Sequence, residues 1–222
     1  MPFQQKITRR TVLSSISPGI VSMMRKFIVL ISLFTATSLH AADDQAKLPR
    51  IIVSEDGRHF LQEGTGTSFR PMGFNYDHDA EGRLIEDYWH TEWDRVDDDF
   101  RDMQKLKANT VRIHLQFGRF MMSPTEPNAA ELSQLTRLLK LAEECNLHLD
   151  ITGLGCYHKK DVPAWYDELS EAERWAAQAE FWKAVANTCR DSNAVFCYDL
   201  MNKPVIGGEQ PAADWLGPAF SG

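Results

Sequence analysis

Apolar strand patterns alternate with amphipathic helix patterns through the middle of this 222-residue chain. The strand patterns lie at residues 69–75, 110–115, 147–151 and 195–201, and a helix pattern fills each interval between them. Alternation of this kind is typical of parallel strands joined by helices that cross over in the right-handed sense. The sequence therefore predicts an α/β fold built on a parallel sheet.

Residues that suit helix N-caps precede each helix pattern. Thr91, Asn128 and Ser170 have side-chain oxygens that accept hydrogen bonds from the first free N–H groups of a helix. Glu131 and Glu173 stand three residues after Asn128 and Ser170, which is the spacing of a capping box. The helices are therefore expected to begin just after these three N-cap residues.

A β-hairpin is expected ahead of the alternating region, within residues 50–66. Apolar residues at 51–53 and 59–61 flank Asp56-Gly57, a pair that accepts positive φ angles in tight turns. Residues 67–222 contain the alternating strands and helices, so they are expected to form the main domain.

The polarity of the strands decides between two arrangements of the sheet, a doubly wound sheet and a (β/α)8 barrel of the TIM type. Helices cover both faces of a doubly wound sheet, so its strands are apolar on both faces. The strand at 110–115 instead alternates, with Val111, Ile113 and Leu115 on one face and Thr110, Arg112 and His114 on the other. No glycine-rich phosphate loop follows the first strand. We therefore expect a barrel of this type, truncated after about four βα units.

The first 41 residues are expected to be a leader that takes no part in the fold. Met24-Arg25-Lys26 is a short basic region, an apolar run follows at residues 27–34, and small residues lead up to the position of cleavage. This is the order of a secretory signal peptide with an upstream extension. A membrane anchor is the alternative, but the run is too short to span a bilayer comfortably. We expect a secreted or periplasmic protein that is not membrane-bound once it is processed.

Charge and cysteine content narrow the classes of partner. The chain has 31 acidic residues against 24 Lys and Arg, and residues 1–41 hold five of the basic residues and no acidic one. Such an acidic chain is a poor partner for nucleic acid and suits a neutral substrate such as a polysaccharide. Its four cysteines lack metal-binding spacing, and no motif implies a cofactor. Cys145 and Cys189 are expected near helix ends, where they either form a disulfide or remain buried thiols.

The fourth strand pattern ends in a motif that bears on chemistry. Residues 195–204 read VFCYDLMNKP, and Pro204 ends the strand because it cannot donate a hydrogen bond to a sheet. Asn202 and Lys203 are thereby expected at the carboxyl end of a strand, where α/β barrels keep their reactive groups. The stretch resembles the fourth-strand signature of glycoside hydrolase family 5, the cellulase type of clan A. In that family the signature is Asn-Glu-Pro and the Glu is the catalytic acid/base, so Lys203 stands at the acid/base position.

Other motifs resemble the same family in order, from the hairpin to the end of the chain. The sequence GFN at residues 73–75 is similar to the end of the family's first strand. The resemblance implies that Arg112 holds the nucleophile carboxylate and that Asn202 contacts the sugar hydroxyl next to the reacting centre. The nucleophile itself is a Glu on the seventh strand of the family, and this chain is expected to end before that strand. Arg112 also has a second interpretation, as a buried arginine paired with Asp150 or Asp199.

Four aromatic side chains are additional candidates for sugar contacts. Trp89 and Trp165 are expected in loops that follow strands, where flat rings suit stacking on sugars and where packing within the loop is the alternative. His114 shares a strand face with Arg112 and is either a sugar contact or a hydrogen-bonded core histidine. His158 is expected in a loop at the same end of the barrel, where it either touches substrate or is exposed to solvent.

Together these motifs predict a glycoside hydrolase-like protein whose partner is a β-linked polysaccharide or oligosaccharide of the cellulose or mannan kind. A retaining glycosidase needs two carboxylates about 5–5.5 Å apart, one of which protonates the leaving oxygen. A charged lysine has no acceptor atom, so we expect this chain to be inactive through Lys203 and truncation. The alternatives are a non-catalytic carbohydrate-binding protein, the remnant of a decayed gene, and a half-barrel that self-associates through its open sheet edges.

Overall fold

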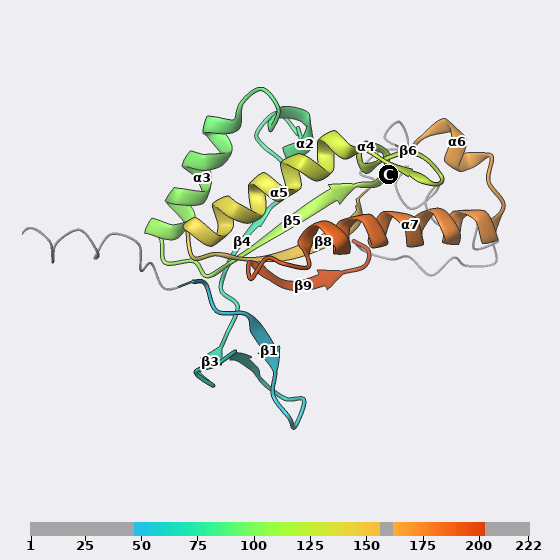
Figure 1. The fold of residues 1–222 in the computed structure, drawn as a ribbon. Coiled ribbons are helices and arrows are strands. Elements are labelled where there is room, and N and C mark those ends of the chain that lie inside the picture. The colour runs from blue at the N-terminus through green and yellow to red at the C-terminus, as the bar shows by residue number, and fades with distance from the viewer. Residues whose placement is uncertain (1–46, 156–161, 203–222) are drawn as a thin grey trace, which may run out of the picture. The chain divides into compact units, whose positions relative to one another are not determined.

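A parallel sheet of four strands lies at the centre of the part of the chain that this computed structural model describes, residues 47–155 and 162–202 (Figure 1). The strands pair side by side in the order β4 (Gly73–Tyr76), β5 (Thr110–Gln116), β8 (His148–Gly155) and β9 (Val195–Asp199). All of these pairings are parallel. The predicted α/β fold with a parallel sheet is therefore confirmed, and the described residues form part of a barrel without closing one.

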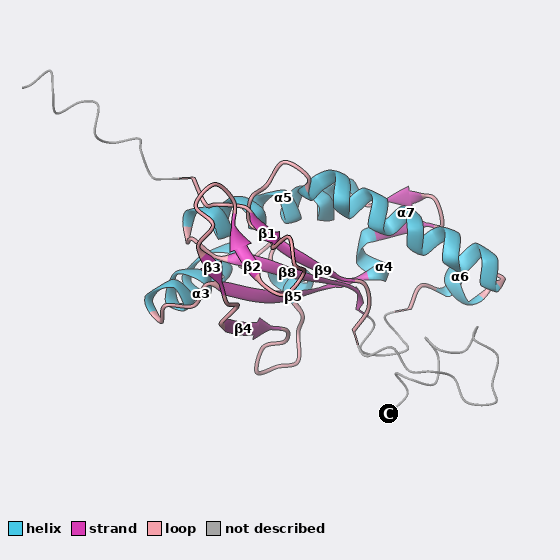
Figure 2. Ribbon diagram, turned by 90° about the horizontal axis from the view of Figure 1, so that it is seen from below, coloured by secondary structure: helices cyan, strands magenta, loops and turns pink. Residues whose placement is uncertain are grey.

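Long helices connect the strands of this sheet. They are α3 (Trp93–Lys105) after β4, α5 (Ala129–Glu144) after β5 and α7 (Glu171–Cys189) after β8. All of them lie on the same face of the sheet (Figure 1 and Figure 2). A (β/α)8 barrel has this arrangement because its helices form an outer ring, whereas a doubly wound sheet places helices on both faces. The expectation drawn from the polarity of the strands is therefore confirmed.

The apolar core lies between the sheet and these helices. Val111, Ile113 and Leu115 on β5 are fully buried, as the alternation of the strand predicted. Leu135 and Leu138 on α5 belong to the same cluster, because apolar residues three or four apart share one helix face. Burial of each large apolar side chain contributes about 1.5–3 kcal/mol to stability. The apolar face of the sheet is thus committed to the core, and the opposite face is left for polar side chains.

The predicted hairpin forms and continues into another strand. β1 (Ile51–Val53), β2 (Phe60–Gln62) and β3 (Ser68–Phe69) make an antiparallel sheet. Gly57 has a φ angle of 70° in the turn between the first two strands, as expected for a glycine at this position. The rings of Phe60 and Phe69 pack against Phe196 near the start of β9, with centroids 4.8 and 5.3 Å away. The hairpin sheet therefore contacts the amino end of the parallel sheet.

The single strand predicted at residues 69–75 is wrong. The structure divides these residues between β3 and β4, which belong to different sheets. Pro71 lies between the two strands and lacks the N–H group that a strand donates to its neighbour. The side chain of Asn109 holds this link, because it accepts a hydrogen bond from the N–H of Met72 at 2.8 Å and donates one to the carbonyl oxygen of Arg70 at 2.9 Å.

Two of the predicted N-caps are confirmed. The side-chain oxygen of Asn128 accepts a hydrogen bond from the N–H of Ala130 at 3.0 Å at the start of α5. At the start of α7, Glu173 Oε2 lies 2.8 Å from the backbone nitrogen of Ser170, which is the predicted capping box. Both contacts are local, so the sequence alone was sufficient to predict them.

The third predicted N-cap, Thr91, is wrong. Helix α3 begins after Glu92, and the hydroxyl of Thr91 donates to the carbonyl oxygen of Tyr88 at the end of a short helix, α2 (Ile85–Tyr88). Glu131 also makes a contact different from the expected one with Asn128, since its carboxylate accepts a hydrogen bond from Trp89. In both cases the short helix α2 and its surroundings supply partners that N-cap spacing does not reveal.

Short elements occupy the remaining connections. They are α4 (Phe117–Phe120), the antiparallel pair β6 (Met121–Ser123) and β7 (Glu126–Pro127), and α6 (Ala164–Asp167). None of the helices that the structure describes is long and apolar enough to cross a membrane. The predicted leader, residues 1–41, lies outside the described residues.

The cysteines in the described ranges are free thiols. Cys145 and Cys189 are buried and form no disulfide with each other, and Cys197 is also free. The disulfide alternative is therefore wrong, and the alternative of buried thiols is confirmed for this pair. Burial raises the pKa of Cys189 to about 12, so this thiol stays protonated at neutral pH. Cys156 lies outside the described residues.

The N-cap of α5 provides a test of the fold. We expect Asn128→Ala to lower the free energy of unfolding by about 1–2 kcal/mol, because Asn128 both caps Ala130 and donates to the carbonyl oxygen of Arg119 at 3.0 Å. Asn128→Asp keeps the cap acceptor and loses only the second bond, so it should cost less. Urea denaturation of both variants measures the difference, and equal costs would contradict this division of roles.

Candidate functional site

Polar side chains line up across the parallel sheet on the face opposite the helices. The register of the strands places one row across β5, β8 and β9 that consists of Arg112, Asp150 and Cys197. The next row, nearer the carboxyl ends of the strands, consists of His114, Thr152 and Asp199. We call these six residues the inner rows. Chemistry in a barrel of this type is carried out at the carboxyl ends of its strands, so the inner rows are the candidate site.

Arg112 lies at the centre of the inner rows. Its Nη2 donates to Asp199 Oδ2 at 2.5 Å, and its Nε lies 3.7 Å from Asp150 Oδ2. The same Nη2 donates to the side-chain oxygen of Asn202 at 3.5 Å. The interpretation of Arg112 as an arginine paired with Asp150 or Asp199 is therefore confirmed, and both acids are involved. Asn202, the second motif residue taken from the resemblance, is 6% exposed and belongs to the same cluster.

Asp150 and Cys197 are cross-strand neighbours in the first inner row. Burial raises the pKa of Asp150, although the hydrogen bond from Cys197 and the charge of Arg112 oppose this rise. Burial, together with the neighbouring charge of Asp150, raises the pKa of Cys197 to about 12. The thiol therefore stays protonated at neutral pH and can donate to the carboxylate, which makes it a structural partner and a poor nucleophile.

His114 is buried on the inner face and contacts an acid that the sequence did not single out. Its Nδ1 lies 3.2 Å from Oδ1 of Asp77, the residue that follows β4. The side chain of Asn75 donates to the other oxygen of Asp77 at 3.5 Å. His114 is thus a buried histidine within ion-pair distance of Asp77, and its contact with a sugar stays a prediction. The available signal for Asp77 was its place directly after the first strand of the sheet, where a barrel keeps its functional side chains.

Trp89 is fully buried, so the prediction that it stacks on a sugar is wrong. Its exposed fraction is 0%, and its Nε1 donates to Glu131 Oε2 at 2.8 Å. Its ring also packs against Phe120, with centroids 6.1 Å apart. A sugar needs a free aromatic face, and Trp89 has none because α4 and α5 supply both contacts. The loop-packing alternative is the correct one for this residue.

The remaining predicted site residues are less fully described. Trp165 is half-buried on α6, with its ring 5.8 Å from that of Phe117, and its contact with a sugar stays a prediction. His158 and Lys203 lie outside the described residues. Of the three residues of the NKP motif, the structure therefore describes Asn202 alone.

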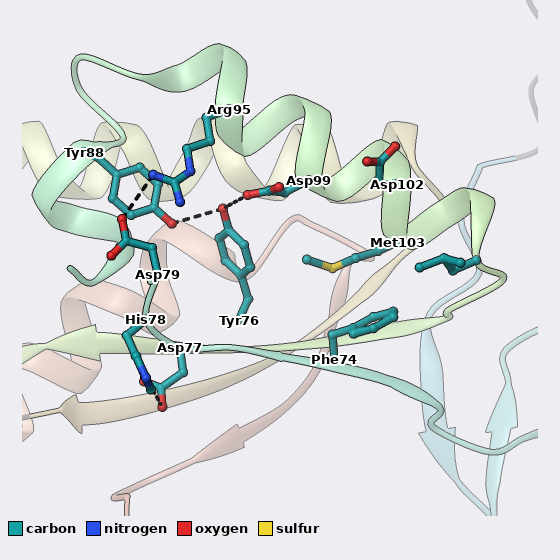
Figure 3. Close-up of a pocket in the computed structure, with 11 residues that line it drawn as sticks. Phe74, Tyr76, Asp77, His78, Asp79, Tyr88, Arg95, Asp99, Asp102 and Met103 are labelled. Atoms are coloured by element: carbon teal, nitrogen blue, oxygen red, sulfur yellow. Dashed lines mark hydrogen bonds and ion pairs between the residues drawn. The ribbon is translucent and has the colours of Figure 1, made fainter. Parts of the chain in front are cut away.

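A pocket of about 320 Å³ lies beside β4, where residues of β4 and α3 line it (Figure 3). Phe74 and Tyr76 line it, and the register pairs them with buried residues of the helix-facing side of β5. The hydroxyl of Tyr88 donates to that of Tyr76 at 3.0 Å, and Tyr76 donates to Asp99 at 2.6 Å. This chain of hydrogen bonds ties β4 to α3. The pocket lies mainly against the helix layer, and it reaches the inner rows at Asp77, which lines it and lies 3.2 Å from His114.

The central role of Arg112 can be tested by a double-mutant cycle. We expect Arg112→Met to lower the free energy of unfolding at pH 7 by about 1–3 kcal/mol, because it leaves the carboxylates of Asp150 and Asp199 without their cation. Asp199→Asn removes one of these charges, so the double variant should lose less than the sum of the single losses. Urea denaturation measures all three, and additivity within about 0.5 kcal/mol would show that the pair is not coupled.

Known proteins are similar to this chain in sequence or in fold. The mannan endo-1,4-beta-mannosidase of Cellvibrio japonicus (strain Ueda107) is 27% identical over 156 residues, which make up 70% of this chain and 30% of that protein. The β-mannanase of the blue mussel Mytilus edulis has a TM-score of 0.53 and 19% identity, over 78% of this chain and 51% of the mussel chain. A GH5_18 protein of Streptomyces cattleya, solved in complex with GlcNAc, has a TM-score of 0.54 and 19% identity, over 64% and 36%. The chain thus spans less than a third of the curated relative and about half or less of these two structures.

The sequence also matches the model of a protein family, beyond its similarity to single proteins. Residues 60–218, well over half of the chain, match the cellulase family, glycosyl hydrolase family 5. The match includes all of the parallel sheet, the inner rows and the NKP motif. The two solved structures agree in fold, since they share the arrangement of strands and helices at low sequence identity. This chain belongs to glycosyl hydrolase family 5.

Proposed function

We propose that this chain provides sugar-binding groups of a family 5 site for a β-linked polysaccharide, with β-1,4-mannan as the first candidate. The observation that carries the proposal is the cluster in which Arg112 contacts Asp150, Asp199 and Asn202 on the inner face of the sheet. The similarity to a mannan endo-1,4-beta-mannosidase and to a β-mannanase supports mannan ahead of cellulose.

The cluster has the chemistry that sugar hydroxyl groups require. Each hydroxyl both donates and accepts a hydrogen bond, and the cluster supplies carboxylate acceptors beside guanidinium and amide donors. A hydrogen bond to a charged group contributes about 1.5–3 kcal/mol when both partners are already in position. Arg112 is held in position by two carboxylates before any ligand arrives, so little side-chain entropy remains to be lost on binding.

We further propose that the chain binds its polysaccharide without cleaving it. Lys203 follows Asn202 in the sequence, at the position where the family has its acid/base Glu. A charged lysine donates but cannot accept a proton, and a general acid/base contributes about 10²–10⁴ to the rate of a reaction. A non-catalytic carbohydrate-binding protein is therefore the form of the family function that this sequence supports best.

Two further proposals concern export and self-association. The order of basic, apolar and small residues before Ala42 supports export by a signal peptide. Among the described strands, β4 and β9 each pair on one side only, which supports self-association through these sheet edges. N-terminal sequencing of the exported protein tests the first proposal, and sedimentation velocity of the purified chain tests the second.

Binding and cleavage can be measured separately. We expect mannohexaose to bind the purified chain in isothermal titration calorimetry, and Asn202→Ala to weaken the affinity by about tenfold, equivalent to about 1.4 kcal/mol, through loss of its amide contacts. Asn187→Ala, on the exposed side of α7, is the matched control and should leave the affinity unchanged.

The same protein should release no reducing ends from mannan above a blank without enzyme. Release by the wild-type chain would overturn the proposal that Lys203 prevents cleavage. A failure of the wild-type chain to bind mannohexaose, cellohexaose or insoluble mannan would overturn the proposal of sugar binding.

A further inference from the structure

The segment that joins β4 to α3 is fastened to the elements around it by charged side chains. We call residues 77–92 the α2 segment, since α2 lies in its middle. Glu86 contacts the end of β5, Asp87 forms an ion pair with Arg119 of α4, and Trp89 donates to Glu131 of α5. A segment of this length between a strand and a helix would otherwise be among the more mobile parts of a barrel. These contacts attach it to three separate elements.

Glu86 is the most deeply buried carboxyl group among these attachments. It is 3% exposed, and its Oε1 accepts a hydrogen bond from the backbone N–H of Gln116 at 2.7 Å. Its Oε2 accepts from the side-chain nitrogen of the same Gln116 at 3.3 Å. A carboxyl group is costly to bury, and an apolar side chain would fill such a site at lower cost. The two hydrogen bonds to one residue indicate that Glu86 serves to hold Gln116.

The attachment lies beside the inner rows. Gln116 is the last residue of β5, two residues beyond His114. The α2 segment begins at Asp77, whose Oδ1 lies 3.2 Å from His114 Nδ1. Asp77 follows Tyr76 in the chain, and both residues are among those that line the pocket (Figure 3). The segment is therefore attached to β5 at two positions, and a shift at Gln116 would move Asp77 relative to His114.

We propose that Glu86 is a positioning residue of the sugar site, which fastens the α2 segment to the end of β5 and thereby sets the place of Asp77 against His114. Its role in sugar binding rests on the proposed function. The fastening itself is a property of the protein alone and can be measured without a sugar.

The fastening should weaken as pH rises. Burial raises the pKa of Glu86 to about 7, against the two hydrogen bonds from Gln116 that lower it, and the nearby charge of Glu131 adds to the rise. The other charged groups that face this region are Asp87 with its partner Arg119 and, next to Glu131, His90. A carboxyl whose pKa is higher in the fastened state than in the open state favours fastening when protonated. The contribution is complete below about pH 4.5 and is lost as pH rises through about 7.

Hydrogen exchange measures the fastening directly. We expect the protection factor of the Gln116 amide and of the amides at 84–91, corrected for intrinsic exchange, to fall by tens of fold between pH 5 and pH 8, since each unit of pKa shift corresponds to about a tenfold change. Glu86→Gln keeps an acceptor for the Gln116 N–H but cannot ionise, so its protection should change by less than about threefold. Glu81→Gln, an exposed acid on the same segment, is the matched control and should behave as the wild type.

The affinity for mannohexaose in the same variants tests the positioning role. We expect the affinity of the wild type and of Glu81→Gln to fall between pH 5 and pH 8, and that of Glu86→Gln to stay nearly constant. Wild-type protection that does not change with pH, or protection in Glu86→Gln that follows the wild type, would overturn the fastening. If protection behaves as expected but the affinity of Glu86→Gln changes with pH in the same way as that of the wild type, the positioning role would be overturned. Protection as expected in a chain that binds no sugar would support the fastening and refute the proposed function.

Discussion

The guanidinium group of Arg112 is the interaction on which the inner face of the sheet depends. Asp150 and Asp199 lie on neighbouring parallel strands, and their charges would repel each other without a cation between them. Arg112 also reaches Asn202, so one side chain of β5 holds together β8, β9 and the motif that follows β9. A planar group with several fixed donors can serve these three partners at once, whereas the compact ammonium group of a lysine could not satisfy the same geometry.

The features that the sequence predicted are those with a local or periodic cause. The alternation in β5 separates Val111 from Arg112, and this assigns one face to the core and the other to the site. Strands of a parallel sheet in nearly equal register bring equivalent positions together, which is why Asp150 and Asp199 were identifiable as partners of Arg112 before the structure. The cap of α5 involves residues only two positions apart, so it was equally accessible.

The features that the sequence did not predict depend on contacts between distant segments. Trp89 has the sequence surroundings of a loop tryptophan, and its burial follows from Glu131, which is 42 residues away. The one sequence signal for Asp77 is its place directly after a strand, and its contact with His114 emerges only when β4 and β5 pair. A single sequence contains the chemistry of these side chains but not their distances. Prediction therefore failed at the connections after the strands, where no periodic pattern restricts the choice.

Recognition of a sugar and cleavage of a sugar are separable parts of the family's chemistry, and the lysine at position 203 concerns only cleavage. Recognition of a sugar depends on donors and acceptors held in place before binding, and Arg112 and Asn202 meet this condition through Asp150 and Asp199. Cleavage depends in addition on a group that exchanges a proton with the leaving oxygen. The proposal of binding without cleavage rests on this separation. Lys203 lacks the carboxyl group that would exchange such a proton, whereas Arg112 and Asn202 keep their hydrogen-bonding groups on the inner face of the sheet.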